Sequence, residues 1–324
     1  MALCGVALQI KYSAVFEGIF FGIVFVGLAW RATRDTASVA AMAGLWIAIA
    51  LVPTALAFGY YVWLGEAQPF LYANFLSIGA RSSASTGELL HRLWRSWRAL
   101  QVPILVVILS IALKPWRHLP GGTRSFSFIL AWLGAALAGY LVFGSYFDHY
   151  VLPLLVPIAV AGAPLFSYRP YRLGPIAACL MLLAGCVAYY VTAHGNVRHH
   201  GGRQGMEQLV AAVRPRMRGC LFVYDGDSML YYLTRSCIPT RYAFPQHLTL
   251  LREAGAIGVD PIAELRRILA GRPHLIVDTR DSHETEENPA ANALVRTELR
   301  RDYRPVASVP HRGGATIVYE RIHP

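Results

Sequence analysis

Two charged side chains near the start of the chain fall at the ends of apolar segments, where ionised groups are costly and usually functional. Lys11 follows a Gly/Ala-rich apolar stretch. A cation there can hold a lipid phosphate, and the simpler alternative is a lysine that snorkels and fixes the depth of a helix. Glu17 lies about one turn into the next apolar run, where it could pair with Lys11, line a cavity or snorkel to the interface.

A second chemically rich segment is Asp148-His149-Tyr150, which opens a later apolar run. Pro153 and Pro157 follow it four residues apart and free backbone carbonyls there. Asp148 is a candidate general base. Alternatively, Asp148 has a structural role and either orients His149 or caps the helix. For His149 itself, the alternative to a site residue is an ordinary interfacial side chain.

Two further groups invite a functional interpretation. Arg81 could clamp an anionic headgroup, or it could be a solvated surface arginine. His194, His199 and His200 cluster near one another, but no Cys/His spacing of a structural metal site surrounds them. We therefore expect a polar juxtamembrane linker and no metal site. No phosphate-cradling loop, Gly-x-Ser-x-Gly elbow or paired helical histidines occur.

These residues must be positioned by a largely apolar chain. The 324 residues are 55% hydrophobic and only 15% charged, with a mean hydropathy of +0.40, which favours lipid as the solvent. Most apolar runs precede His194 and most charge follows it. We predict a helical membrane domain over 1–193 and a soluble α/β domain over 194–324. The net charge of +11 forms no basic stripe with interleaved aromatics, so nucleic acid is not an expected partner.

Six runs are apolar enough to span a bilayer, which takes about 20 residues per helix. They cover 13–30, 38–63, 99–113, 125–143, 150–166 and 173–192. The third is the shortest. Tryptophan and tyrosine fall near the ends of the runs, as interfacial belts would require.

Charge in the gaps predicts the orientation. One set of gaps is rich in positive residues, namely Arg31, Arg34, Lys114, Arg117, Arg124, Arg169 and Arg172. These gaps should face the cytoplasm, which puts Lys11, the loop 64–98, Asp148 and the C-terminal domain on the outer face of a bacterial inner membrane. Within that loop, 70–76 and 88–97 should form short amphipathic helices that lie flat at the interface.

After His194 the pattern changes to short strands and helices. We expect strands at 220–224 and 275–278, helices at 205–214, 228–234, 261–271 and 289–301, and a closing hairpin of 303–309 with 315–322. If the helix at 228–234 runs back beside the first strand, Cys220 and Cys237 come close. A disulfide would then form in an oxidising outer compartment, with two separate buried thiols as the alternative.

Three stretches together resemble the C-terminal portion of bacterial GT-C type glycosyltransferases of the mannosyltransferase and aminoarabinose transferase superfamily. The first runs from Gly5 to Ala14 and contains Lys11-Tyr12. The second runs from Tyr146 to Pro157 and contains His149-Tyr150. The third joins Leu230-Tyr231-Tyr232-Leu233-Thr234 to Pro239-Thr240-Arg241-Tyr242.

The resemblance implies sugar transfer, with inversion at the anomeric carbon, from a polyprenyl-phosphate donor in the membrane lipid to a glycan, lipid or protein acceptor. Lys11 and Tyr12 match positions around the donor phosphate, beside which we also place Arg81, and His149 and Tyr150 match the sugar cavity. No cofactor is identifiable, and the question whether the complete enzyme uses a divalent metal stays open. The sugar and the acceptor stay open too.

In that family an acidic general base lies in the first outer loop, and this sequence has no such loop. Its opening residues 1–12 lack a leader and look like the tail of a membrane helix. The chain is therefore expected to begin partway through a longer gene product and to transfer no sugar by itself. Two other classes stay open, a transporter or flippase for a lipid-linked substrate and a membrane-anchored binding module.

Overall fold

The structure, a computed structural model, describes residues 1–81, 85–280, 287–312 and 314–322. The chain divides into two compact units. The helical unit comprises Met1–Ala67 and Ala84–Ala188, and the mixed unit comprises Gln68–Ser83 and Tyr189–Pro324. Each unit is described by itself.

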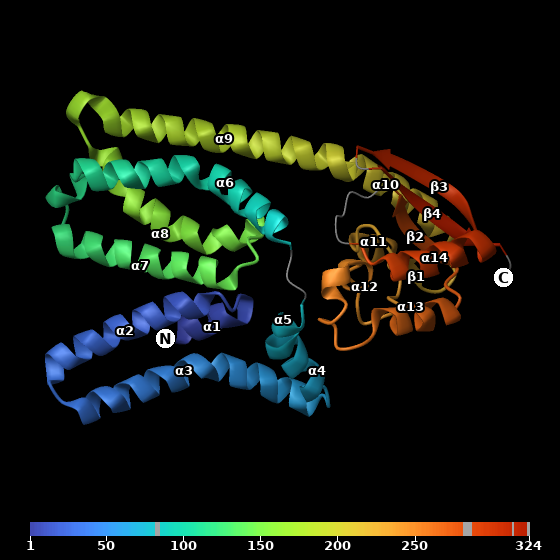
Figure 1. The fold of residues 1–324 in the computed structure, drawn as a ribbon, viewed down its shortest axis with the longest axis horizontal. Coiled ribbons are helices and arrows are strands. Elements are labelled where there is room, and N and C mark those ends of the chain that lie inside the picture. Colours follow the sequence, from blue (N-terminus) through green and yellow to red (C-terminus); the bar gives the residue numbers. More distant parts are fainter. Residues whose placement is uncertain (82–84, 281–286, 313, 323–324) are drawn as a thin grey trace. The chain divides into compact units, whose positions relative to one another are not determined.

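The helical unit is built from long helices that run side by side (Figure 1). In chain order they are α1 (Ala2–Ile10), α2 (Ala14–Thr33), α3 (Thr36–Trp63), α6 (Thr86–Leu113), α7 (Gly122–Phe143), the composite η3 (Asp148–Val151), α8 (Leu152–Gly162) and η4 (Ala163–Ser167), and α9 (Leu173–His200), which belongs to this unit as far as Ala188. Within the described residues, six helical segments have the length and apolar composition to cross a membrane. All six predicted runs fall within these segments, except for Ser13, which precedes α2.

Side-chain caps decide where two of these helices begin. The Asp35 carboxylate accepts the backbone N–H groups of Ala37 at 3.2 Å and Ser38 at 2.9 Å, which starts α3. The Ser85 hydroxyl accepts the N–H of Glu88 at 3.3 Å and starts α6. Each cap satisfies N–H groups that have no partner inside the helix.

The third span differs from its prediction. Residues 88–97 form no separate interfacial helix, because α6 runs unbroken from Thr86 through this segment and past Pro103 to Leu113. The inward stripe consists of Arg92, Ser96 and Leu100, which follow one another at i, i+4 and i+8 and so share a face.

Its large apolar side chains point the other way. Leu90, Trp94 and Trp97 are 61%, 58% and 48% exposed. The outer face of α6 is thus apolar and its inner face partly polar, which is the reverse of a helix in a water-soluble protein. This pattern is typical of a helix surrounded by lipid.

Close packing of α1 against α3 depends on one glycine. A Cβ atom on Gly5 would lie 2.2 Å from the carbonyl oxygen of Ala50 and 3.1 Å from the Pro53 side chain. Gln9 donates to the Thr54 hydroxyl at 2.6 Å one turn further on. The missing side chain at Gly5 therefore brings the two backbones into contact, as small residues do between membrane helices.

The mixed unit contains a four-stranded sheet in the order β1-β2-β4-β3. The strands are β1 (Leu221–Val223), β2 (Leu275–Arg280), β3 (Tyr303–His311) and β4 (Gly314–Arg321), and only β1 and β2 pair in parallel. The helices are α10 (Gly202–Val213), α11 (Met229–Thr234), α12 (Gln246–Thr249), α13 (Pro261–Ala270) and α14 (Pro289–Asp302). The predicted strands, helices and α/β class are confirmed to within a few residues, except for α12, which was not foreseen. The centre of the predicted hairpin, Gly313, lies outside the described residues.

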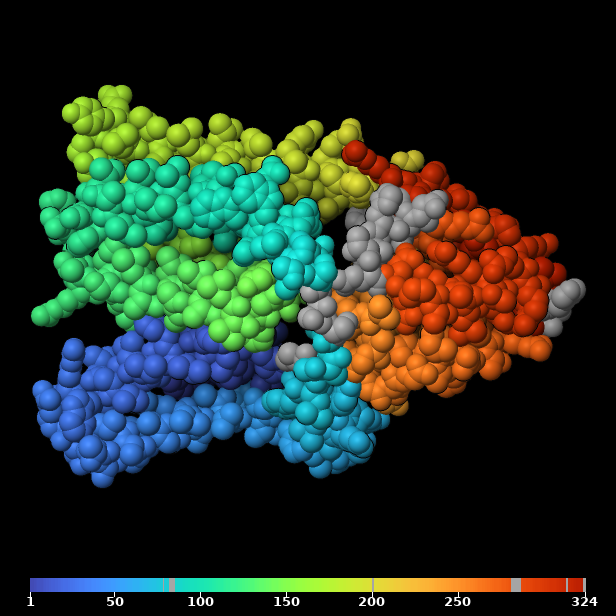
Figure 2. Space-filling model, viewed as in Figure 1, coloured from blue at the N-terminus to red at the C-terminus, as the bar shows by residue number. Residues whose placement is uncertain are grey.

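Side chains alternate along the strands, which places two hydrophobic cores on opposite faces of the sheet. Phe222 and Ile276 pack with α13 and α14 on one face, whereas Leu221, Val223 and Val277 pack with α10 and α11 on the other. Successive residues of a strand point to opposite faces, so the sheet is covered by helices on both sides. In Figure 2 the part of this unit that holds α13, α14 and the strands β2 to β4 appears as a closely packed body in orange and red.

The predicted polar linker at 194–200 is helical, because α9 continues to His200. The His194 ring stacks on Tyr190 at 5.6 Å, and the His200 side chain lies outside the described structure.

The predicted amphipathic segment 70–76 is helical. It spans α4 (Ala67–Leu71), η1 (Tyr72–Leu76) and the start of α5 (Ser77–Ala80). Residues 70–76 belong to the mixed unit, where the Tyr72 hydroxyl donates to the carbonyl of Gly255 at 2.5 Å.

The predicted disulfide between Cys220 and Cys237 is confirmed, with the two Cα atoms 4.8 Å apart. It joins the residue before β1 to the segment after α11. Such a bond is characteristic of oxidising compartments, and it fixes the position from which residues 238–242 leave α11.

Replacing Gly5 with alanine should lower the stability of the α1–α3 contact. Overpacking of this kind costs about 1–3 kcal/mol, because the new Cβ meets backbone that cannot move aside. Thermal unfolding of the full chain in detergent would measure the effect. Gly44→Ala in α3 is the matched control, since nothing lies within 4 Å of its added Cβ. Equal midpoints in the two variants would contradict this account.

The contact between Arg81 and Glu253 should depend on pH. The guanidinium lies 3.3 Å from the carboxylate, and His247, at 3.6 Å, followed by Arg81, holds the pKa of Glu253 below its ordinary value. A lowered acid pKa adds stability above the unfolded value of about 4.3 and loses it as pH falls through the folded value.

Glu253→Gln should therefore lower the unfolding midpoint of the full chain at pH 7, by an amount that corresponds to about 1 kcal/mol. The difference should shrink as the pH falls through the lowered pKa of Glu253, below which the wild-type carboxyl group is itself protonated. Glu207→Gln removes a fully solvated pair with Arg203 and should change little. A pH-independent difference at Glu253 would show a purely steric effect.

Candidate functional site

The break between α1 and α2 presents Lys11. Helix α1 ends at Ile10, Lys11 takes an extended conformation with φ −158° and ψ 124°, and α2 begins at Ala14. The side chain can therefore leave the direction of either helix. Its Nζ donates to the backbone carbonyl of His149 at 3.0 Å and lies 4.2 Å from the centre of the Tyr150 ring.

Three rings continue from this contact. His149 and Tyr150 meet edge to face at 4.6 Å, and the ring of Phe147 stacks on His149 at 5.7 Å with an angle of 13°. Phe147 also meets Tyr150 edge to face at 5.6 Å. The η3 turn and the residue before it thus form a compact aromatic group next to the lysine.

A second cation closes the far side of this group. The Arg92 guanidinium lies 4.3 Å from the centre of the Phe147 ring and donates to the carbonyl of Ser145 at 3.3 Å. Glu88, one turn earlier on α6, binds Arg92 at 2.7 Å. We call Lys11, Arg92, Phe147, His149 and Tyr150 the cation–aromatic cluster.

The two cations are balanced differently. Arg92 is buried and has a carboxylate partner, whereas the partners of Lys11 in the described structure are a carbonyl oxygen and a ring face. Neutral partners orient an ammonium group without cancelling its charge. Lys11 therefore keeps a positive charge that a phosphate or another anion could bind.

Three of the predicted substrate-binding residues, Lys11, His149 and Tyr150, come together from segments 138 residues apart. Tyr12 follows Lys11 in the turn and is partly buried. The predicted base Asp148 is 61% exposed at its side chain and is bound by Arg95 of α6. This pairing favours the structural role for Asp148, which anchors the start of η3.

The remaining predicted residues have other partners. Arg81 belongs to the mixed unit and pairs there with Glu253, so its charge is balanced within that unit. Glu17 neither snorkels freely nor pairs with Lys11, because its carboxylate accepts the indole N–H of Trp132 in α7 at 2.7 Å. Within the residues described, no group of three His, Cys, Asp or Glu side chains could hold a metal ion.

Sequence reasoning missed Arg92 and Phe147 as members of the cluster. A flat interfacial helix at 88–97 would place Arg92 among the lipid headgroups, yet Arg92 is only 8% exposed. A signal was present in the spacing of Glu88, Arg92 and Ser96 at i, i+4 and i+8, which marks a continuous polar stripe on an otherwise apolar helix.

Residues 239–242 of the mixed unit, which belong to the third stretch of the resemblance, are held in place by hydrogen bonds. Arg267 donates to the carbonyl of Pro239 at 3.0 Å, and Thr240 donates to the Glu264 carboxylate at 2.6 Å. The Tyr242 hydroxyl donates to the carbonyl of Ile257 at 2.9 Å. The segment borders a pocket of about 620 Å³, and its role in the fold explains these polar residues without a ligand.

The chain was also compared with known proteins. No protein-family model, curated protein or solved structure matches it. The geometry of the cation–aromatic cluster and the membrane-spanning character of the helical unit are therefore the basis on which a function can be proposed.

Proposed function

We propose that the chain is part of a membrane glycosyltransferase of the GT-C type, which uses a polyprenyl-phosphate sugar as donor at the outer face of the membrane. The observation that carries the proposal is the contact of Lys11 with His149 and Tyr150. It joins, in one place, two of the three stretches on which the resemblance to these enzymes rests.

The chemistry of the cluster suits such a donor. Lys11 supplies a positive charge for the lipid phosphate. The rings of His149 and Tyr150 offer the flat apolar faces on which a sugar ring can pack, and the His149 imidazole adds a polar group for its hydroxyls. An exposed apolar surface on the surrounding helices would accommodate the polyprenyl chain.

The disulfide of the mixed unit supports the outer location. Cys220 and Cys237 are bonded, and such bonds persist in the periplasm or outside the cell but rarely in the cytosol. An outer mixed unit also agrees with the orientation that the Lys and Arg residues of the short gaps predict.

Donor binding gives the direct test. Native mass spectrometry of the full chain in detergent should detect bound undecaprenyl phosphate, and Lys11→Met should weaken that binding at least about tenfold, as expected for one lost charge-assisted contact. Methionine keeps the apolar stem while removing the charge. Lys114→Met, at the chain's other lysine, should bind like the wild type.

Equal affinity in the two lysine variants would contradict the proposal. It would leave Lys11 as a residue that only holds η3 in place. Binding that persists without sugar transfer, together with movement of the lipid between leaflets of a vesicle, would favour the transporter. Sugar transfer by this chain that Asp148→Asn abolishes would identify Asp148 as the base.

Topology gives an independent prediction. Alkaline phosphatase fused after the last residue should be active in bacterial cells, whereas green fluorescent protein at the same point should stay dark, because the first folds only outside the cytoplasm. Fusions in the gap between α6 and α7, which carries Lys114, are the control and should show the opposite pattern. A reversed pair of results would exclude an outer-face enzyme.

A further inference from the structure

A second pocket lies on the α14 face of the sheet in the mixed unit. It encloses about 450 Å³, within the roughly 300–1,000 Å³ of small-molecule sites. Its polar and aromatic lining comes from the strands β2, β4 and β3 and from α14, and consists of Asp278, Arg280, Arg296, Arg300, Tyr303 and Tyr319.

Elementary geometry brings these side chains together. Asp278 and Arg280 are two residues apart on β2, so they point to the same face of the sheet, which is the face of Ile276 and α14. Arg296 and Arg300 are four residues apart on α14 and lie one above the other. Strand and helix thus direct three guanidinium groups at one space.

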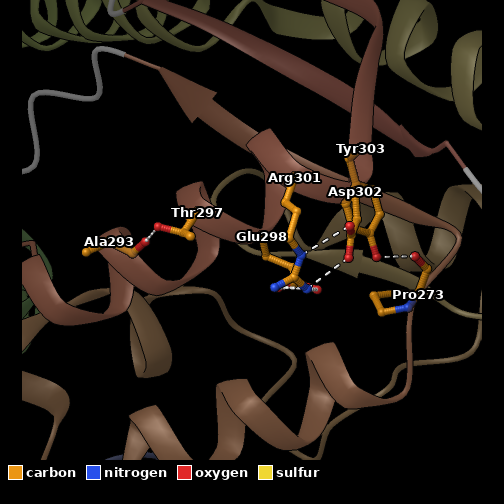
Figure 3. Close-up of polar contacts among 7 residues, drawn as sticks. All are labelled: Pro273, Ala293, Thr297, Glu298, Arg301, Asp302 and Tyr303. Carbon is orange, nitrogen blue, oxygen red and sulfur yellow. Dashed lines mark hydrogen bonds and ion pairs between the residues drawn. The ribbon is translucent and has the colours of Figure 1, made fainter.

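Among the residues that the structure describes, the arginines of the pocket lack the carboxylate partners that a neighbouring arginine has. Arg301 is held by Glu298 at 2.8 Å and by Asp302 at 2.9 Å (Figure 3). In the described part of the unit, Arg280, Arg296 and Arg300 form no ion pair. Like charges spaced i, i+4 on a helix repel one another, so the arrangement favours an anion between them.

Asp278 lies at the floor of the pocket and is only 3% exposed. Burial raises its pKa to about 6, against the opposing influence of Arg296 and Arg280 and with a smaller raising effect of Glu287. A raised pKa means that ionising Asp278 costs the folded state free energy. This cost is absent below the unfolded pKa and fully present above the folded pKa of about 6. Such groups are frequent at functional sites.

We propose that this pocket binds a small sugar or polyol that carries a phosphate or carboxylate group, with the anion held by Arg296, Arg300 and Arg280 and a hydroxyl donated to Asp278. The proposal does not rest on the membrane chemistry proposed above, because the site lies wholly within the mixed unit.

The arginines and the acidic Asp278 together explain why the ligand needs both an anionic group and a hydroxyl group. The guanidinium groups bind phosphate or carboxylate through paired N–H donors. A bare anion would leave the buried carboxylate of Asp278 facing another negative charge, which is unfavourable in a poorly solvated place. A hydroxyl group that donates to Asp278 removes this conflict and gives the carboxylate the partner that its burial requires.

Calorimetric titration of the full chain in detergent at pH 7.5 tests the site with four probes. Glucose 6-phosphate and glucuronate carry the anion and the hydroxyls, inorganic phosphate carries only the charge, and glucose carries only the hydroxyls. At least one of the first two should bind at least about tenfold more tightly than phosphate or glucose, as one further charge-assisted hydrogen bond allows. Their relative affinity distinguishes the phosphate from the carboxylate source.

Variants separate the roles of the residues. Arg296→Gln and Arg300→Gln should each weaken the preferred probe about tenfold or more. Arg301→Gln, on the same helix but bound by Glu298 and Asp302, should leave its affinity unchanged. Asp278→Asn should weaken the preferred probe while inorganic phosphate binds equally or better, and its unfolding midpoint should equal or exceed that of the wild type.

Three results would overturn the proposal. The first is no binding of either anionic sugar by the wild-type chain. The second is equal losses in the Arg296, Arg300 and Arg301 variants, which would indicate general electrostatics. The third is an Asp278→Asn variant that unfolds at the wild-type midpoint and binds every probe as the wild type does, which would remove the hydroxyl contact.

Discussion

The constraint that shapes the helical unit is the high free-energy cost of holding a cation among apolar helices. Lys11 and Arg92 both meet it with ring faces and backbone carbonyls from the segment Ser145–Tyr150. Because each cation needs those partners, the start of α2, the first part of α6 and η3 must gather at one place. The close approach of α1 to α3 at Gly5 then fixes the helix from which Lys11 departs.

Much of the architecture could be predicted because it depends on local sequence. Spans follow from runs of apolar residues, strand faces from alternation, and the caps at Asp35 and Ser85 from neighbours two or three residues away. The error at the third span has a physical cause. An amphipathic surface helix and the polar-faced start of a membrane helix share the same 3.6-residue period, so spacing alone cannot tell whether Arg92 faces headgroups or the interior.

The site was predicted only in part, for a different reason. Lys11, His149 and Tyr150 could each be selected by type and position, but their contact joins residues 138 apart, and nothing local encodes it. The same holds for Gln68–Ser83, which belongs to the mixed unit although the rest of that unit begins only at Tyr189, more than a hundred residues later. There the hydroxyl of Tyr72 and the guanidinium of Arg81 find their partners in Gly255 and Glu253.

The two cationic sites handle charge in opposite ways, and the difference follows from their surroundings. At Lys11 the partners in the described structure are a carbonyl oxygen and a ring face, so no carboxylate there cancels the positive charge. In the pocket beside α14 the arginine side chains are exposed while Asp278 is buried, and within the described residues none of these arginines forms an ion pair with it. The pocket thus adds a buried hydrogen-bond acceptor to its cations, whereas the first site places ring faces and an imidazole beside its cation. Under the two proposals, a hydroxylated anion would be distinguished from a simple phosphate by a hydrogen bond to Asp278 in the pocket and by packing on His149 and Tyr150 in the first site.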